Sequence, residues 1–330
     1  MNTSICAVTV AYNNPRELGR LLSSLENQDD ALDGLIIIDN SDDDQSAGNR
    51  EVLSLHSRRY LFTRYLRTQS NRGSAAGFRS GMKIAHEQGF SWVWLLDQDG
   101  AVSPGCLTQL LRYADKGDIL CPDIRAIDEP HTHIPKIYAN NFLGGWYPAV
   151  WCLTRCQIQT FGTHGVLISK KALDTIGYYD DSFFFVGWED YDYGYRATRV
   201  GLAIRYVGTA EALHPSSRPS KIPKTFRWFP VLLQCVTEPE VRRTRDKKTS
   251  SISPFSQAYL ESKHLKSWQF GVALVYSSLF ALYHKATQRK EVSLTATLRL
   301  FVRCLTHNMR KDWPYSSVEQ LCREILVGDT

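Results

Sequence analysis

Hydrophobic and polar positions in the first hundred residues alternate between strand-like and helix-like patterns. Four apolar runs, rich in Val, Ile and Leu, are the candidate strands: 5–12, 35–38, 60–67 and 92–96. Leucines at helical spacing follow the first run, at positions 18, 21, 22 and 25, and a second helix is expected from the turn at 70–73 through Ala85. Strands separated by helices predict right-handed βαβ units and a parallel sheet.

Each candidate strand is followed by a polar cluster. The clusters occupy residues 12–14, 39–44, 71–73 and 97–99. Ligands of open α/β sheets bind at the carboxyl ends of the strands. The sequence therefore predicts that the four clusters form one wall of a single site.

The pattern is looser after Ser103. Residues 128–162 are rich in turn residues and aromatics, which favours a meander over a helix. Further elements are expected as a short helix at 169–176, a buried strand at 183–185, a helix at 191–200 and a strand at 202–213. Three regions are predicted on this basis: an α/β domain at 1–215, a basic linker or mobile loop at 216–255, and a helical basic region at 256–330.

Asp97-Gln98-Asp99, at the end of the run WVWLL, is the strongest chemical signal. Two carboxylates one residue apart can hold a hard divalent cation against a phosphate, although an acidic turn has the same sequence. His214 also follows a strand, and Pro215 would stiffen its backbone. It is a candidate third ligand for the metal, with a structural or surface histidine as the alternative.

Three further carboxylates lie where a helix is expected to begin, at Glu189, Asp190 and Asp192. Acidic residues favour helix N-termini, which accounts for one or two of them, Asp192 most easily. The functional interpretation is that one accepts a proton from an attacking hydroxyl. Trp188 beside them offers an apolar face for a sugar ring or is a core residue.

The polar residues near the other strand ends carry weaker signals. The segment from Asn71 to Gly77 is neither a P-loop nor GxGxxG, which argues against a Walker-type ATPase, but its small residues would let backbone N–H groups approach a phosphate. Asp39 is a candidate contact to a nucleoside or a plain turn residue.

Taken in order, these segments resemble an inverting nucleotide-sugar glycosyltransferase of glycosyltransferase family 2, which has the GT-A fold. The similar segments are VTVAYNNPRELGRLLSSL, IIIDNSD, SNRGSAAGFRSGM, WVWLLDQD, THGVLISKKALDTIGYYDDSFF and GWEDYDYGYRATRVG, and they cover about residues 4–214. Within the family, bacterial rhamnosyltransferases and galactofuranosyltransferases are most similar. The fold implied is a Rossmann-like, mostly parallel sheet flanked by helices, with a mainly helical C-terminal region.

The resemblance implies a role for each matching position. Asp97 and Asp99 would bind Mn²⁺ or Mg²⁺ on the donor diphosphate, with His214 as a further ligand. Asp190 would be the catalytic base, supported by Glu189, with Trp188 in the acceptor site. Asp39 and Asn71 would lie by the nucleotide, as would Asp97. Two departures are Gln98 in the middle of the triplet, and YLESKH at 259–264, which only loosely matches a tract expected in the subgroup.

Charge distinguishes the two ends of the chain. The whole sequence has 39 Lys and Arg against 34 Asp and Glu, but residues 214–330 have 19 basic and 9 acidic side chains. Apolar and aromatic residues accompany the basic ones, which is typical of contact with an anionic bilayer, and a helical subdomain packed on the catalytic domain is the alternative. No nucleic-acid-binding module accompanies the basic residues. The partners expected are a nucleotide-sugar donor, a glycan acceptor linked to lipid, and an anionic membrane surface.

The eight cysteines form no CxxC pair, and no signal peptide is evident, so free thiols and a cytoplasmic location at the inner face of the membrane are expected. The longest apolar run, at 268–283, is shorter than a membrane-spanning helix needs. The function predicted is sugar transfer from UDP-galactofuranose or dTDP-rhamnose in O-antigen or capsule synthesis. The alternatives are a sugar nucleotidyltransferase, disfavoured because AYNNPRELG replaces its glycine-rich loop, and a non-catalytic carbohydrate-binding scaffold.

Overall fold

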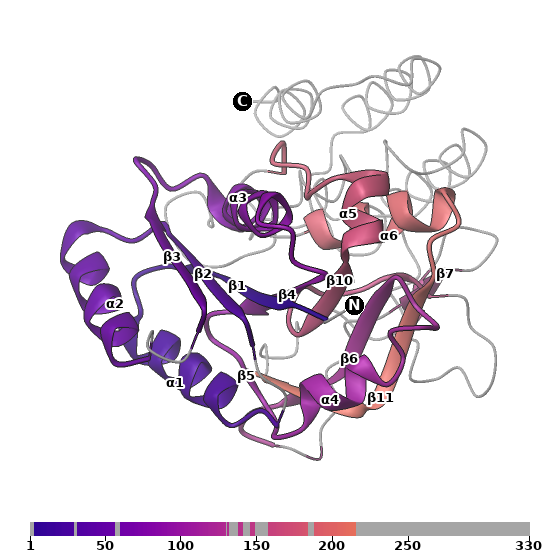
Figure 1. Cartoon of the computed structure of the whole chain (residues 1–330), viewed down its shortest axis with the longest axis horizontal. Helices are drawn as coiled ribbons and strands as arrows, with labels where there is room; N and C mark the ends of the chain where they lie inside the picture. The colour runs from indigo at the N-terminus through magenta and orange to yellow at the C-terminus, as the bar shows by residue number, and fades with distance from the viewer. Residues whose placement is uncertain are drawn as a thin grey trace, which may run out of the picture. The chain divides into compact units, whose positions relative to one another are not determined.

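The computed structural model describes residues 3–29, 32–56, 60–129, 131, 138–140, 146–148, 158–183 and 188–215 of the chain (Figure 1). The chain divides into two compact units, and the first, made of residues 1–139, 147–181 and 189–220, contains nearly all of the described elements. The predicted linker and C-terminal helical region lie outside the described residues, so the domain boundaries at 215 and 255 stay predictions.

A mixed sheet of eight strands forms the centre of the first unit. Its strands are β1 (Ile5–Ala11), β2 (Gly34–Asp39), β3 (Phe62–Arg67), β4 (Trp92–Asp97), β5 (Ala101–Val102), β6 (Ile119–Ala126), β10 (Val166–Ser169) and β11 (Ile204–His214). The spatial order is β3-β2-β1-β4-β10-β6-β11-β5. Strands β3, β2, β1 and β4 run parallel, as do β6 and β11, whereas β10 is antiparallel to both of its neighbours. The expected α/β, mostly parallel sheet is confirmed.

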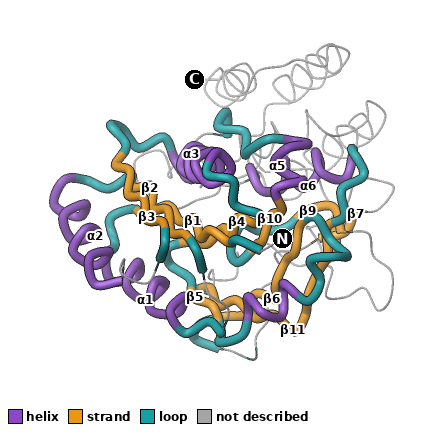
Figure 2. The backbone as a smooth tube through the Cα atoms, viewed as in Figure 1, coloured by secondary structure: helices purple, strands orange, loops and turns teal. Residues whose placement is uncertain are grey.

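Helices cover both faces of this sheet (Figures 1 and 2). One face carries α1 (Pro15–Glu26), α2 (Asp43–His56) and α4 (Cys106–Leu111), and the other carries α3 (Gly73–Glu87), α5 (Lys170–Ile176) and α6 (Glu189–Arg199). The alternation of side chains along β1 explains both layers, because Ile5 and Ala7 pack on the first face whereas Cys6 and Val8 pack on the second. Both faces of the strand are buried, as the continuous apolar run predicted.

Helix α3 packs unusually close to the sheet because glycines face it. A Cβ atom on Gly81 would lie 2.3 Å from Val8 Cγ1, and one on Gly77 would lie 2.7 Å from the Cγ atoms of Val10. Only a residue without a side chain fits at this distance. The close approach brings the first turn of α3 to the carboxyl ends of β1 and β2.

Several elements differ from the predicted ones. Strands β6 and β10 and helices α2 and α4 were not predicted individually. Phe183 lies in a bend rather than a strand, and the other two residues of that predicted strand are outside the described residues. The region 128–162, expected to be a meander and not a helix, contains three short strands among its described residues: β7 (Tyr138–Asn140), β8 (Trp146–Pro148) and β9 (Ile158–Thr160), in the order β8-β7-β9.

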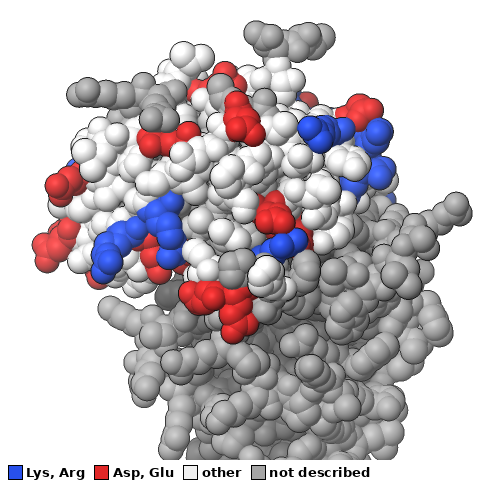
Figure 3. All heavy atoms as spheres, turned by 90° about the horizontal axis from the view of Figure 1, so that it is seen from below, with Lys and Arg blue, Asp and Glu red and all other residues white. Residues whose placement is uncertain are grey.

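The described residues have the mixed surface charge and the buried thiols that are usual in a globular domain. Acidic and basic side chains are interspersed over the face shown in Figure 3. The described cysteines, Cys6, Cys106 and Cys121, are free and buried, and burial raises the pKa of each thiol. Among the helices that the structure describes, none is long and apolar enough to span a bilayer.

Candidate active site

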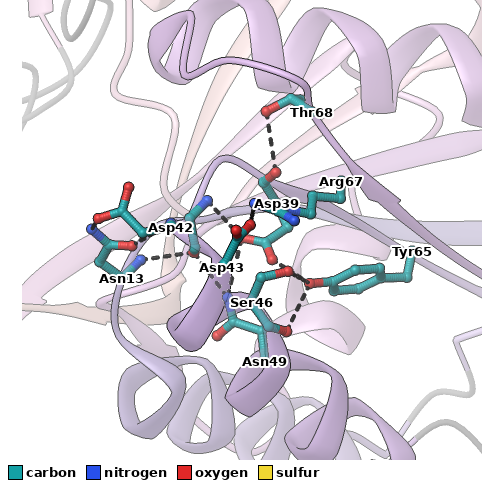
Figure 4. Close-up of polar contacts among 10 residues, drawn as sticks. Asn13, Asp39, Asp42, Asp43, Ser46, Asn49, Tyr65, Arg67 and Thr68 are labelled. Carbon is teal, nitrogen blue, oxygen red and sulfur yellow. Dashed lines mark hydrogen bonds and ion pairs between the residues drawn. The ribbon is translucent and has the colours of Figure 1, made fainter.

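The loops that follow β1, β2 and β4 are joined by hydrogen bonds at the carboxyl edge of the sheet. Asn13 and Asp42 exchange two bonds, from Asn13 Nδ2 to Asp42 Oδ2 (3.0 Å) and from Asp42 N to Asn13 Oδ1 (2.9 Å) (Figure 4). Gln98 accepts from the backbone N–H of Tyr12 at 2.6 Å and donates to the carbonyl of Asn14. The structure therefore brings the polar clusters 12–14, 39–44 and 97–99 together at one edge.

The fourth cluster lies at the same edge. The backbone N–H of Gly73 donates to Asn71 Oδ1 at 2.8 Å, and Asn40 Nδ2 donates to the carbonyl of Gly73 at 3.1 Å. Asn71 thus shapes the turn that enters α3. The predicted wall is assembled from all four segments.

Asp97, Asp99 and His214 form a cluster of metal-ligand type. One ligand atom from each lies within 4.8 Å of the others, and His214 Nε2 is 3.5 Å from Asp97 Oδ2 and 3.5 Å from Asp99 Oδ1. Atoms bound to one ion at about 2.1 Å lie about 3 Å apart when adjacent and about 4 Å apart when opposite. Two carboxylates and an imidazole at this spacing are a donor set that could hold a divalent cation.

Strand pairing explains how His214, more than one hundred residues along the chain, reaches the acidic pair. The two-residue strand β5 follows the Asp97–Gly100 turn and pairs antiparallel with the end of β11, so that Leu213 lies opposite Ala101. The Nδ1 atom of His214 lies 2.9 Å from the carbonyl oxygen of Pro215, which can only accept. A proton on Nδ1 would satisfy this contact, and Nε2, which faces the two carboxylates, is the ring nitrogen placed to bind a cation.

Other charged groups adjoin this cluster from helix α1. Arg20 donates to the backbone carbonyl of Asp99, which fixes the outer half of the turn. Burial and the Asp99 carboxylate raise the pKa of Glu17, because both disfavour a further negative charge there. The edge of the sheet is thus an electronegative region in which a cation would be stabilised.

Sequence reasoning assigned no role to His164, which is fully buried behind the acidic turn. Its Nδ1 atom lies 3.1 Å from the backbone nitrogen of Asp97, and its Nε2 atom lies 3.0 Å from the carbonyl oxygen of Ala101. The ring also contacts His214 edge to face, with 5.6 Å between centroids. The signal that points to it is a histidine in a Thr-His-Gly turn directly before an apolar strand.

Thr163, which directly precedes His164, connects this turn to the start of α6. The carboxylate of Asp190 accepts a hydrogen bond from the backbone N–H of Thr163 at 3.1 Å. Glu189 is buried and accepts from Ser74 Oγ, in the first turn of α3, at 2.7 Å. Asp192 is buried too, but it pairs with Arg196 at 2.8 Å one helical turn later, so its role is structural.

Trp188 directly precedes α6 and has a φ of 78°, in the left-handed region that non-glycine residues rarely adopt. A conformation of this kind costs about 1–3 kcal/mol and persists where the surrounding structure imposes it. The strain lies next to the candidate base, in the position that the sequence assigned to the acceptor.

Asp39 lies at the end of β2 in a dense hydrogen-bond network (Figure 4). Its carboxylate accepts from Ser41 N at 2.9 Å, from Asn49 Nδ2 at 3.1 Å and from the hydroxyl of Tyr65. Burial alone would raise the pKa of Asp39, but the hydrogen bonds outweigh it and hold the pKa below its usual value. Burial and Asp39 raise the pKa of Tyr65 to about 12. Asp39 is thus an ionised carboxylate that shapes the loop after β2.

Comparison with known proteins agrees with this architecture. The solved structure of GalNAc-T7 with UDP, GalNAc and Mn²⁺ superposes with a TM-score of 0.59 at 14% identity, covering 98% of this chain and 58% of that one. The mannosyltransferase PcManGT from Pyrobaculum calidifontis, in complex with GDP-Man and Mn²⁺, gives 0.53 at 14% identity and covers 99% and 88%. At this identity the likeness establishes the fold, which is that of GT-A glycosyltransferases.

Sequence comparison then gives the family. The chain belongs to glycosyl transferase family 2, whose sequence model matches residues 6–177. Galactofuranosyltransferase GlfT1 of Mycobacterium tuberculosis is 37% identical over 133 residues, which are 39% of this chain and 42% of that protein. GlfT1 of Mycolicibacterium smegmatis is 27% identical over 228 residues, covering 64% and 70%. The match therefore spans less than half of the M. tuberculosis relative.

Proposed function

We propose that the protein is an inverting, metal-dependent glycosyltransferase that moves a sugar from a nucleoside diphosphate to a hydroxyl group of a glycan. One observation carries this proposal. The Asp97, Asp99 and His214 cluster and the carboxylate of Asp190 are held by two consecutive residues, Thr163 and His164. A donor-binding metal centre and a base for the acceptor are the two parts that the reaction needs.

The donor side of the site is assigned to the acidic cluster. Asp97, Asp99 and His214 would hold Mn²⁺ or Mg²⁺, and the bound cation would offset the charge on the departing diphosphate. Asn71, which shapes the turn into α3, would lie by the nucleotide, with small residues bringing N–H groups close to phosphate. Asp39, at the end of β2, is assigned to the part of the site that would bind the nucleoside.

The acceptor side is assigned to the start of α6. Asp190 would take the proton of the acceptor hydroxyl. The hydroxyl oxygen then bonds to the anomeric carbon of the donor sugar as the bond from that carbon to the diphosphate breaks. A single displacement inverts the configuration. The N–H of Thr163 orients the carboxylate of Asp190, Glu189 supports it through its bond to α3, and Trp188 would pack against the acceptor sugar.

The preferred donor is UDP-galactofuranose, with dTDP-rhamnose second, because the tract WEDYDYGYRA and the relatives named galactofuranosyltransferase both support it. The acceptor proposed is a lipid-linked glycan of a bacterial surface polysaccharide, such as O-antigen or capsule. Such an acceptor would place the enzyme at the cytoplasmic face of the membrane.

Calorimetric titration of UDP, dTDP and GDP, each with and without Mn²⁺, tests the donor side. We expect metal-dependent binding of one nucleotide by the wild type, lost in Asp99→Ala and kept in Asp115→Asn, an exposed acidic position ahead of β6 and outside the four polar clusters. If folded wild-type protein binds none of the nucleotides in the presence of an acceptor glycan, the metal-dependent donor site is wrong and the scaffold interpretation takes its place.

The Asp190→Asn variant tests the base. Removal of a general base lowers kcat by about 10²–10⁴-fold, and we expect that loss with nucleotide affinity unchanged. The anomeric configuration of the product, read by NMR, should be opposite to that of the donor. Unchanged turnover in Asp190→Asn, or a product of retained configuration, would contradict the assignment.

A further inference from the structure

The Asp97–Ala101 turn, which presents both acidic ligands, has little secondary structure of its own. The N–H of Gly100 donates to the carbonyl of Asp97 at 3.1 Å, and the chain then enters the two-residue strand β5. Acidic side chains on a turn repel each other, so a site for a divalent cation needs a support that holds them at a fixed spacing.

The side chain of His164 forms a hydrogen bond to each end of this turn. The backbone N–H of Asp97 is a donor, so the Nδ1 atom that it contacts accepts, and Nε2 carries the proton that goes to the carbonyl of Ala101. Both ring nitrogens are used and the side chain is fully buried. These contacts define a neutral imidazole protonated on Nε2.

The ring also fills the space inside the turn. A Cβ atom on Gly100 would lie 2.0 Å from the Cε1 atom of His164, so glycine is required for the turn to close over the ring. On its other side the ring packs edge to face against His214, the third member of the cluster. His164 thus contacts the backbone on either side of the two acidic ligands and the side chain of the third.

We propose that His164 is a positioning residue for the metal site: it holds the Asp97–Ala101 turn and the His214 ring in the geometry that binds a divalent cation, without binding the cation itself. This inference rests on the metal role proposed above. Because Thr163 bonds to Asp190, the same two residues also set the position of the base relative to the metal.

Three substitutions separate the two hydrogen bonds. His164→Asn keeps an acceptor where Nδ1 lies, His164→Gln keeps a donor where Nε2 lies, and His164→Ala removes both. The matched control is His86→Asn. His86 lies in the last turn of α3, at the opposite edge of the sheet, and bridges Tyr178 and Asp174.

Mn²⁺ affinity of the full chain is measured from the free-ion EPR signal, alone and with UDP, dTDP or GDP, and Tm is recorded for each variant. Loss of a residue that supports metal ligands weakens binding by about 10–100-fold, which we expect for His164→Ala. His164→Asn should recover more affinity than His164→Gln because Asp97 is itself a ligand. His86→Asn should leave Mn²⁺ binding unchanged.

The outcomes distinguish this inference from the proposed function. Wild-type protein that binds no Mn²⁺ contradicts the metal site. Wild-type binding matched by folded His164→Ala, or Tm losses with no change in affinity, contradicts the role of His164. If the variants do not fold, long-range ¹H–¹⁵N NMR of the wild-type histidines gives the answer: a proton on Nδ1 of His164, or ring signals that Mg²⁺ with UDP, dTDP or GDP does not shift, overturns it.

Discussion

Gln98, in the middle of the acidic triplet, does not face the metal ligands. Its amide accepts from Tyr12 N and donates to the carbonyl of Asn14, so it ties the loop after β1 to the end of β4. A carboxylate at this position could accept but not donate. The neutral residue that departs from an all-acidic triplet therefore has a structural reason.

Gln98→Glu should lower the free energy of unfolding by about 1–3 kcal/mol at pH 7.5, since the Asn14 carbonyl loses the Gln98 donor, keeps only the N–H of Leu18 and faces a negative charge. Acidification should reduce the loss, because a protonated carboxyl can donate again. Urea unfolding at pH 7.5 and 5.5 measures both effects. Gln45→Glu, on the exposed first turn of α2, is the control and should change stability by less than about 0.5 kcal/mol. Equal effects of the two variants would contradict the hydrogen-bond account.

Asp39 owes its lowered pKa to hydrogen bonds, and Tyr65 provides one of them. A carboxylate whose pKa is lower in the folded state stabilises the fold above its unfolded pKa of about 3.9, and the contribution is lost as the pH falls through the folded pKa. Part of the stability at neutral pH is therefore linked to this group.

Tyr65→Phe should cost about 1.5–3 kcal/mol at pH 7, the range for a hydrogen bond to a charged group. The cost should decrease as the pH is lowered from 7 to about 3, with most of the decrease below about 3.9, because protonation of Asp39 removes the charge that the hydroxyl stabilises. Denaturant unfolding at the two pH values measures this, with Tyr12→Phe as the exposed control. A cost that does not depend on pH would show that packing, and not the charge of Asp39, accounts for it.

Among the elements, α3 depends on glycines that its sequence periodicity does not explain. Gly81 lies against Val8, whereas a Cβ atom on Gly19 in α1 would lie 3.6 Å from Val52 Cγ1, an ordinary contact distance. Alanine has a higher helix propensity than glycine at both positions. The two helices therefore allow packing and propensity to be separated.

Gly81→Ala should destabilise the protein by about 1–3 kcal/mol, because overpacking against the sheet exceeds the gain in propensity. Gly19→Ala should stabilise it by about 0.5–1 kcal/mol. Thermal and urea unfolding give both values, and calorimetry with nucleotide shows whether displacement of α3 disturbs the site. Stabilisation by both substitutions would mean that α3 can move away from β1 without cost.

The sequence predicts the elements whose pattern is local and misses those that depend on distant partners. Strand β1 and helix α1 follow from apolar runs and leucine spacing. Strand β6 contains Pro122, which disfavours a strand, and the structure accommodates it opposite Val207, where β11 has a register shift. Strand β10 has four residues and runs directly into α5, so its pattern merges with that of the helix.

In the candidate site too, residues marked by a local pattern were predicted and a residue that depends on distant partners was not. Asp97, Asp99 and His214 were predicted to come together because each ends a strand, and the resemblance to the family gave the roles proposed for them. The Thr-His-Gly turn before an apolar strand is the only local signal for His164, and it does not show the role, because the partners of the ring are backbone atoms 63 and 67 residues away. Side chains that bond to distant backbone become visible only in the folded structure.

For the whole molecule, the uneven charge along the sequence bears on where the proposed transferase would act. Residues 1–213 have 20 basic and 25 acidic side chains, whereas residues 214–330 have 19 and 9. Each Lys or Arg near an anionic leaflet contributes about 1 kcal/mol to membrane binding. If the proposed acceptor is lipid-linked, attraction between the basic part of the sequence and an anionic leaflet would bring the domain at residues 1–213, which has a net negative charge, to that acceptor.

The full chain should sediment with vesicles that contain anionic phosphatidylglycerol and not with phosphatidylcholine vesicles, and 0.5 M NaCl should release it because salt screens the attraction. Neutral substitution of Arg242, Arg243 and Arg245 should weaken binding by on the order of 100-fold. The same number of charges removed at the exposed positions Arg16, Lys83 and Arg112 should have little effect. Equal loss in both triple variants would mean that net charge alone governs binding, and equal sedimentation with neutral vesicles would exclude the electrostatic account. Binding confined to anionic vesicles and to the first set of charges would assign membrane contact to the basic region, and donor chemistry could then be measured on the released protein separately from acceptor access.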